Sequence, residues 1–444
     1  MLLWRFHKIP ILLTFLSCIF YAAFAYDLTR ADYTKLLCLY VVLFFLFYKF
    51  IYLGKANLQF LVGLAILFRV VFLFATPNLS QDFYRFIWDG RLILEGMNPY
   101  LFTPESFINA GKSPIAQAQE LYLGMGELNG SHHTNYPPIK QFIFFISSLI
   151  AGKSILGSVI VMRLFIIAAD IGILYFGKKL LEKLQIPLYY IFWYLLNPFI
   201  IIELTGNLHF EGVMLFFLLW SLYLLHSGKW QLAAVIFALS VSVKLIPLLF
   251  LPLFFQKLGF KKAMLFYCIV AVITLGLFLP FYNDTFISNY SQTVALWFGK
   301  FEFNASIYYV LREIGFLFRG YNEIATIGKL TTIVVFIFVM LIAFYRRNKS
   351  TEELIAAMLL ALSFYFFTAT TIHPWYIATL LLLSIFTNYK FPLVWAFMVI
   401  LSYIAYANNN HTENLWIIGL EYVVVYTVFI REVFLKRPIK FMSF

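Results

Sequence analysis

The chain has 444 residues, of which 62% are hydrophobic and only 12% are charged. This composition excludes a soluble globular protein and indicates an integral membrane protein that crosses the bilayer many times. In a soluble protein, the formal net charge of +12 would suggest a nucleic-acid partner. Here the basic residues lie mostly in short loops, where membrane orientation explains them, so no nucleic-acid partner is expected. The three cysteines all lie inside apolar segments, which predicts no disulfide framework.

Apolar stretches of spanning length predict an all-α polytopic membrane protein with about 13 to 14 transmembrane helices. In chain order, the predicted parts are N-terminal transmembrane helices at 1–76, a large extracytoplasmic loop with juxtamembrane helices at 77–157, a central transmembrane module at 158–281, a second extracytoplasmic loop at 282–323 and C-terminal transmembrane helices at 324–444. The large loop is expected to carry amphipathic and re-entrant helices.

Three apolar stretches decide how these parts are oriented. Residues 139–151 are too few for an ordinary crossing, and we interpret them as a re-entrant or interfacial helix on the outer side. Residues 230–258 are too many for one helix, and we expect a hairpin that breaks near Lys244. A short helix is expected at 374–388. The basic loops then share the cytoplasmic side with both termini, and the loops that carry polar residues emerge together on the outer face.

A charged cluster follows the third apolar stretch, in a chain that otherwise avoids charge, and the chemistry is expected there. In a helix, Asp82, Arg85 and Asp89 share one face. Phe83 and Gly90 fall on the opposite face, which fits a helix lying flat at the membrane surface with its charged side toward water. The alternative is a solvated loop helix with surface ion pairs.

Two further charges, Arg163 and Asp170, lie two turns apart on one face of a predicted membrane helix. Both are expected to be buried away from the outer loops. We interpret them as structural charges that other helices satisfy.

Several short strings, taken together, carry a family resemblance. They are DFYRFIWDGRLILEGMNPY at 82–100, YPP at 136–138, ELTGNLHFEG at 203–212, KLIP at 244–247, FNASIYYVL at 303–311 and HPWY at 373–376. Their order and spacing resemble those of the prokaryotic polyprenyl-phosphate-mannose-dependent mannosyltransferases of the GT-C superfamily. The similarity runs from about residue 77 to 376, over most of the chain.

The resemblance implies a GT-C-like membrane enzyme. Such an enzyme moves a hexose, expected to be mannose, from a polyprenyl phosphate to an acceptor glycan, lipid or protein. The transfer takes place at the extracytoplasmic face of the cytoplasmic membrane, by inversion, with no cofactor and without a required metal. The absence of a Gly-rich phosphate loop agrees with a reaction that needs no nucleotide.

The resemblance also implies roles for individual residues. An acidic residue early in the first large outer loop acts as the general base in these enzymes, which points to Asp82, with Asp89 as the alternative. The cationic or potentially cationic groups expected to bind the donor phosphate are Arg85, Arg91, Lys140, Lys244 and His373. The residues expected to bind the sugar or the acceptor are Tyr136, Glu203, Asn207, His209, Glu211, Trp297, Asn304, Trp375 and Tyr376.

Some of these residues also have a plainer interpretation. Lys244 lies between long apolar runs, where a lysine is costly unless it is paired or faces water, or unless it snorkels to the interface. His373 could instead cap or pack against the helix that follows it, and the tryptophans could be interfacial belt residues. Glu203 and His209 alone are too few to indicate a metal site.

Two other classes of function remain open from the sequence. A transporter or flippase for a lipid-linked sugar would use the same basic and aromatic groove without covalent chemistry. A nonenzymatic scaffold does not explain an outer loop with paired carboxylates. The identity of the acceptor and the linkage formed are not indicated by any motif.

Overall fold

The computed structural model describes residues 2–299, 301–408, 410 and 412–437, and the side chains of 8–296 and of 301 onward within these ranges. The predicted sugar-binding residue Trp297 therefore lies outside the described side chains. Within the described residues the fold is helical, and its one isolated β-bridge joins Phe303 to Thr371.

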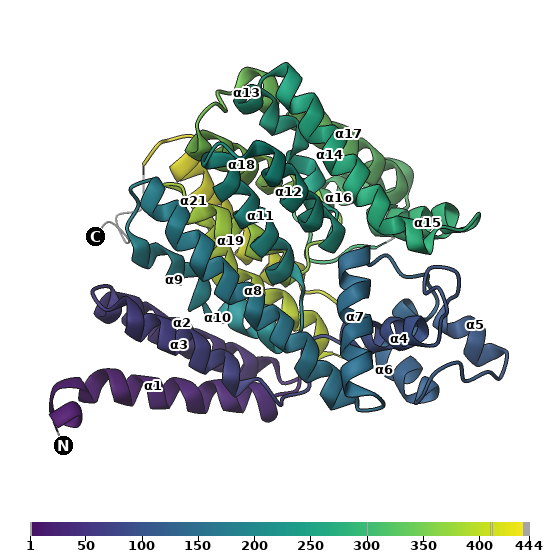
Figure 1. The fold of residues 1–444 in the computed structure, drawn as a ribbon, viewed down its shortest axis with the longest axis horizontal. Helices are drawn as coiled ribbons and strands as arrows, with labels where there is room; N and C mark the ends of the chain where they lie inside the picture. The colour runs from purple at the N-terminus through teal and green to yellow at the C-terminus, as the bar shows by residue number, and fades with distance from the viewer. Residues whose placement is uncertain (1, 300, 409, 411, 438–444) are drawn as a thin grey trace.

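The N-terminal half begins with three apolar helices and then four helices of the predicted large loop. The first group is α1 (Leu2–Tyr26), α2 (Tyr33–Gly54) and α3 (Leu58–Val71). The second group is α4 (Asp82–Leu94), α5 (Pro104–Asn109), α6 (Ala118–Gly130) and α7 (Pro138–Ala151). In Figure 1, α4, α5 and α6 gather beside α7, at the end of the molecule away from the N-terminus.

The central part combines long helices with short broken ones. It contains α8 (Ile155–Lys183), η1 (Leu188–Ile191), α9 (Phe192–Leu195), α10 (Pro198–Ile200), η2 (Ile201–Gly206), α11 (Glu211–His226), α12 (Trp230–Val243), η3 (Ile246–Phe254), α13 (Phe255–Leu258), α14 (Phe260–Phe278) and η4 (Leu279–Phe281). The expected break near Lys244 is confirmed, because α12 ends at Val243 and Lys244 has an extended backbone. Pro247 and Pro252 lie in η3, where a regular α-helix cannot continue.

The C-terminal part returns to the centre of the molecule, as Figure 1 shows for α19 and α21. It contains α15 (Phe286–Gly299), α16 (Ile307–Arg319), α17 (Ile324–Tyr345), α18 (Thr351–Thr368), η5 (Pro374–Tyr376), α19 (Ile377–Ser384), α20 (Phe391–Met398), η6 (Val399–Ala407) and α21 (Leu415–Val433). The expected short helix after His373 is present as η5 and α19.

Six helices in the described part of the chain are long and apolar enough to cross a membrane, or seven if one bent pair at 188–206 counts as a span. The prediction of an all-α polytopic membrane protein is therefore confirmed. The number of 13 to 14 crossings stays a prediction, because the further apolar helices are only 10–17 residues long, against about 20 for an ordinary span.

Two buried charges are satisfied inside the helix bundle, as expected. Arg69 on α3 donates from Nε to Asp170 on α8 at 2.7 Å. Arg163 donates to the carbonyl oxygens of Thr205 and Gly206 at 2.8 and 2.9 Å. These contacts fasten α3 and the end of η2 to α8, because an unpaired charge at this depth would be costly.

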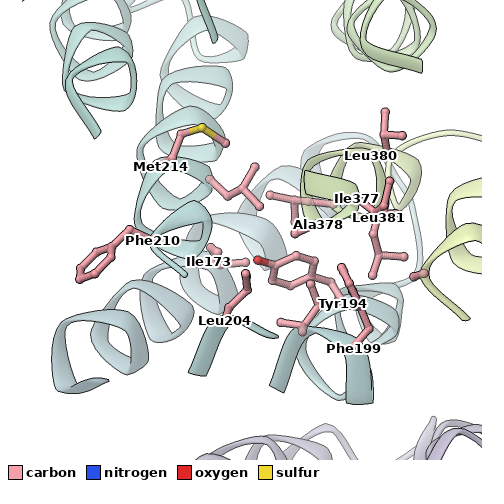
Figure 2. Close-up of a cluster of buried hydrophobic side chains, with 14 of the residues drawn as sticks. Ile173, Tyr194, Phe199, Leu204, Phe210, Met214, Ile377, Ala378, Leu380 and Leu381 are labelled. Carbon is pink, nitrogen blue, oxygen red and sulfur yellow. The ribbon is translucent and has the colours of Figure 1, made fainter. Parts of the chain in front are cut away.

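The hydrophobic core includes the apolar side chains of α19, the helix that follows His373. Figure 2 shows Tyr194 surrounded by apolar side chains that include Leu204 of η2 and Ile377 of α19. Tyr194 is fully buried. The core therefore anchors the helix that follows the HPWY motif, and it gives that motif a rigid base.

The charged helix α4 does not lie with its charged side toward water, so that expectation is wrong. It packs against α7 and α6, and the side chains of Arg85 and Asp89 are 3% and 0% exposed. The cause is Gly90, where an added Cβ would lie 2.2 Å from the carbonyl oxygen of Phe144. The missing side chain lets the two helices approach closely, and their charged residues become internal.

Candidate active site

A cavity of about 1190 Å³ lies between the predicted large loop, the turn before α11, the break after α12 and the C-terminal helices. The residues predicted from the sequence that line it are Asp82, Arg85, Tyr136, Lys140, His209, Glu211, Lys244, His373, Trp375 and Tyr376. Residues that lie almost 300 positions apart in the chain thus face one space.

Asp82 is the carboxylate of α4 that lines this cavity. It begins the helix, and its Oδ1 accepts a hydrogen bond of 3.2 Å from the Asn129 side chain of α6. Burial raises the pKa of Asp82, while the Asn129 hydrogen bond and the charges of Lys140 and Lys244 act in the opposite direction. A raised pKa makes the ionised carboxylate a better proton acceptor.

Asp89, two turns later on the same helix, does not line the cavity. Its two oxygens accept from Arg85 Nε at 2.8 Å and from Gln141 Nε2 at 3.0 Å. Arg85 also donates to the carbonyl oxygens of Asn129 and His132, so its guanidinium is largely engaged by protein groups. The Arg85–Asp89 pair fastens α4 to α7 and to the end of α6.

Lys140 lines the cavity, and its ammonium group lies among three aromatic rings. Its Nζ lies 4.1 Å from the ring centre of Tyr136, 5.1 Å from that of Phe86 and 5.5 Å from that of Phe210. No carboxylate pairs with this ammonium group among the described residues. Burial lowers the pKa of Lys140 to about 8. The ring faces stabilise the cation weakly and leave it available to an anion.

Lys244 has a carboxylate partner, in contrast to Lys140. Its Nζ pairs with Oε1 of Glu211, the first residue of α11, and lies 4.2 Å from the ring centre of Tyr376. Glu211 is almost fully buried, whereas the Lys244 side chain is 26% exposed. The interpretation of Lys244 as a snorkelling residue is therefore not needed, because the break after α12 places it at the cavity wall beside a counter-ion.

A row of stacked rings forms another part of the wall. The imidazoles of His209 and His373 lie 3.6 and 4.6 Å from the Trp375 indole, nearly parallel to it. Burial lowers the pKa of both histidines, that of His373 to about 3. With this lowered pKa, His373 would act toward a phosphate as a neutral hydrogen-bond donor and not as a cation; its role in phosphate binding stays a prediction.

Besides Asp89, four of the predicted site residues are buried outside the cavity lining. Arg91 donates to the carbonyl oxygens of Ala116 and Lys153, and so ties the large loop together. Glu203 accepts from the Tyr403 hydroxyl at 2.8 Å. Asn207 and Asn304 bind backbone groups and side chains of neighbouring segments. In this structure these residues contact protein groups, and none of them faces the space available to a ligand.

The cavity also contains residues that the sequence analysis missed. Asn129 holds Asp82, and Arg30, Tyr309, Arg312 and Glu413 line the far side. Only FNASIYYVL, which contains Tyr309, carried a signal, because the other four lie outside the recognised strings. A search for polar residues next to helix ends would have found Asn129 and Glu413 as candidates.

One arm of the cavity is apolar. It is lined by Leu248, Leu249 and Pro252 of η3 and by Val335, Phe336 and Val339 of α17. One wall of this arm is α17, a helix long and apolar enough to cross a membrane. The cavity therefore joins a polar centre to a space suited to a hydrocarbon chain.

No group of three or more His, Cys, Asp or Glu side chains that could hold a metal ion occurs in the described part of the chain. The Nε2 atom of His209 lies 3.7 Å from Oε2 of Glu203, too far for a hydrogen bond. Because burial keeps this imidazole neutral, the contact is not an ion pair either.

The helical fold and its long apolar helices define a polytopic membrane protein, and the protein encloses a cavity with charged and apolar walls. Residues 20–258, more than half of the chain, match the family model described as alpha-(1->6)-mannopyranosyltransferase, N-terminal domain. The chain belongs to this mannosyltransferase family, in agreement with the resemblance carried by its motifs. No curated protein matches the chain. The matched stretch includes Asp82, Lys140 and Lys244 but ends before the C-terminal half of the cavity.

Proposed function

We propose that the chain transfers mannose from a polyprenyl phosphate to a hydroxyl group of an acceptor, with inversion at the anomeric carbon. One observation carries this proposal: a single cavity joins a carboxylate, two lysines and an apolar arm. The arm suits the prenyl chain, the lysines suit the phosphate, and the carboxylate suits the attacking hydroxyl.

In the proposed reaction Asp82 is the general base. It accepts the proton of the acceptor hydroxyl while that oxygen attacks the anomeric carbon and the bond from this carbon to the phosphate oxygen breaks. One base suffices for such a single displacement. Because the displacement inverts the configuration, an alpha-linked product, as in the family's name, requires a beta-linked mannosyl phosphate as the donor.

The leaving group is a lipid phosphate whose negative charge grows as the bond breaks. Lys140 and Lys244 carry positive charge beside Asp82, since the charges of both act on the Asp82 carboxyl. Cations preorganised at the position of the developing charge stabilise the transition state more than the ground state. His373 adds a neutral hydrogen-bond donor at the same wall.

The direct test uses the purified protein with radiolabelled polyprenyl-phosphate mannose and a lysate of candidate acceptors. Release of the lipid phosphate, with label on an acceptor, supports the proposal. A transporter or flippase would instead move the labelled lipid across a liposome membrane without chemical change, and that result would overturn the proposal.

We propose further that the cavity opens at the outer face of the cytoplasmic membrane, with both termini in the cytoplasm. In a variant without the native cysteines, Ser131→Cys should react with an impermeant maleimide in intact cells. Lys179→Cys, at the opposite end of α8 from this loop, should react only after lysis. Labelling of Lys179→Cys in intact cells would mean that α7 crosses the membrane. The orientation of the chain after α7 would then be the opposite of the one proposed.

The pH dependence should have two limbs. Asp82 must be ionised to act as a base, and burial raises its pKa, so kcat/KM should rise with pH through a value above that of an ordinary aspartate. Lys140, with a pKa of about 8, should lose its charge above that pH and bind phosphate less well. Lys140→Arg should remove the alkaline limb, because arginine keeps its proton. An alkaline limb that is unchanged in Lys140→Arg would contradict this assignment.

A further inference from the structure

The short segment 301–306 connects the α15 region to α16 and lies against the connection between α18 and η5. The Phe303 N–H donates to the Thr370 carbonyl at 3.1 Å, and the Ile372 N–H donates to the Phe303 carbonyl at 2.8 Å. These two bonds form the parallel bridge between Phe303 and Thr371. The backbone immediately before His373 is therefore held by this segment.

The segment is itself fastened to the C-terminal helix through Asn304. The Asn304 side chain donates to Glu421 Oε1 at 3.2 Å, and the Tyr422 hydroxyl donates to the Asn304 carbonyl at 2.6 Å. The Asn304 N–H donates to Glu413 Oε1 at 2.7 Å. Asn304 has a φ of +46°, a left-handed conformation that asparagine tolerates better than most residues.

Glu421 is fully buried on α21, and it faces neutral donors. Its Oε1 also accepts from Trp395 Nε1 at 3.0 Å. No lysine, arginine or histidine pairs with it among the described residues. Burying a carboxyl group costs free energy, and here only two neutral donors offset that cost. We therefore ask which part of the structure the contacts of Glu421 hold in place.

The contacts continue from Asn304 into the cavity wall. The Phe303 ring stacks on His373 with ring centres 5.4 Å apart, and His373 stacks on Trp375. Tyr376, three residues after His373, lies under the Lys244 ammonium. The position of η5 relative to Lys244 thus depends on a segment that α21 holds in place.

We propose that Asn304 and Glu421 are positioning residues for the donor site. Neither lines the cavity, and both act through the bridge at Phe303, which sets the wall formed by His373, Trp375 and Tyr376. This inference rests on the proposed function for the role of that wall. It gives α21, which lies outside the stretch matched by the family model, a part in the site.

A purely structural role is the alternative, and α21 supplies a matched control. Glu432 is another buried carboxylate of the same helix, and it accepts from the backbone N–H groups of Lys390 and Phe391 at 2.8 and 2.9 Å. It has no contact with the cavity wall. Removal of Glu432 should therefore lower stability without changing the donor site.

The first experiment needs no substrate. In the full-length protein in nanodiscs, amide hydrogen exchange is compared between wild type, Glu421→Ala, Asn304→Gly and Glu432→Ala. We expect Glu421→Ala and Asn304→Gly to speed exchange at least about tenfold in peptides covering both 301–306 and 370–376. Glu432→Ala should affect only peptides near 390. Unchanged exchange at 370–376 in both of the first two variants would overturn the proposal.

The second experiment measures the donor KM and kcat of the same proteins. Asn304→Gly keeps the left-handed backbone and removes only the side-chain bond, so it should raise the donor KM at least about fivefold while its Tm falls no more than that of Glu432→Ala. Glu421→Gln keeps the acceptor oxygen, so its donor KM and kcat should stay near the wild-type values. Because the two residues share one hydrogen bond, the donor KM of the double variant Asn304→Gly/Glu421→Ala should rise no more than that of the worse single variant.

These results separate the two proposals. If Asn304→Gly and Glu432→Ala change KM equally, the contact is only structural and the inference is wrong. If the wild-type protein transfers no mannose from a polyprenyl phosphate, the proposed function fails. The exchange data then still decide whether Asn304 and Glu421 hold the wall.

Discussion

Asp82→Asn should lower turnover by at least about a hundredfold, the low end of what a positioned acid-base group contributes. The substitution keeps the size of the side chain and its hydrogen bond to Asn129, but it removes the group that accepts the proton. Donor binding should survive, because the lysines and the apolar arm are untouched. Single-turnover kinetics with saturating donor would show the loss in the chemical step alone.

Asp89→Asn, two turns later on α4, is the matched control. It weakens the buried pair with Arg85, so it should reduce thermal stability while the folded fraction keeps turnover within about tenfold of wild type. The opposite pattern, with an active Asp82→Asn and an inactive but folded Asp89→Asn, would transfer the role of base to Asp89. Circular dichroism on both variants checks the fold.

Lys244→Ala should raise the donor KM and lower kcat together. A charge-assisted hydrogen bond contributes about 1.5 to 3 kcal/mol, so kcat/KM should fall by about 10- to 150-fold. The effect is enlarged because the substitution leaves Glu211 buried without its partner, next to the incoming phosphate. Lys244→Arg should recover part of the donor affinity by keeping the charge, with less recovery of rate because the fork geometry differs.

A double substitution tests this explanation. Lys244→Ala/Glu211→Gln removes both charges, so it should bind the donor better than Lys244→Ala alone. If Lys244→Ala leaves both constants within about twofold of wild type while Lys140→Ala abolishes donor binding, the phosphate is held by Lys140 and Lys244 only balances Glu211.

The membrane class and many local features could be predicted from the sequence. Long apolar runs predict helices because only helices satisfy their own backbone in lipid. The break at Lys244 and the helix after His373 follow from proline and from helix length, which act over a few residues. The sequence identifies Asp82, Lys140, Lys244 and His373 as site candidates, and in the structure all four line one cavity.

The function of each charge within those strings could not be predicted in the same way. Asp82 and Asp89 lie on the same face of one helix. Asp82 lines the cavity, whereas Asp89 is buried and accepts a hydrogen bond from Gln141. The difference arises from the close approach of α7 at Gly90, and a single sequence does not show which helix packs there. The sequence likewise predicts ligand-binding roles for Arg91 and Asn304, because it does not show that neighbouring segments occupy their polar groups.

The sequence by itself therefore determined the all-helical membrane class, the places where helices break and the residues from which a site could be built. These properties depend on hydrophobic length, on proline and glycine, and on the cost of charge in an apolar chain, all of which act locally. Only the tertiary structure decided that Asp82 faces the cavity, that Lys244 is paired with Glu211 and that Asn304 is hydrogen-bonded to Glu421 of α21. Such choices depend on contacts between segments far apart in the chain, where one tight helix crossing or one buried hydrogen bond selects among side chains that are equivalent in the sequence.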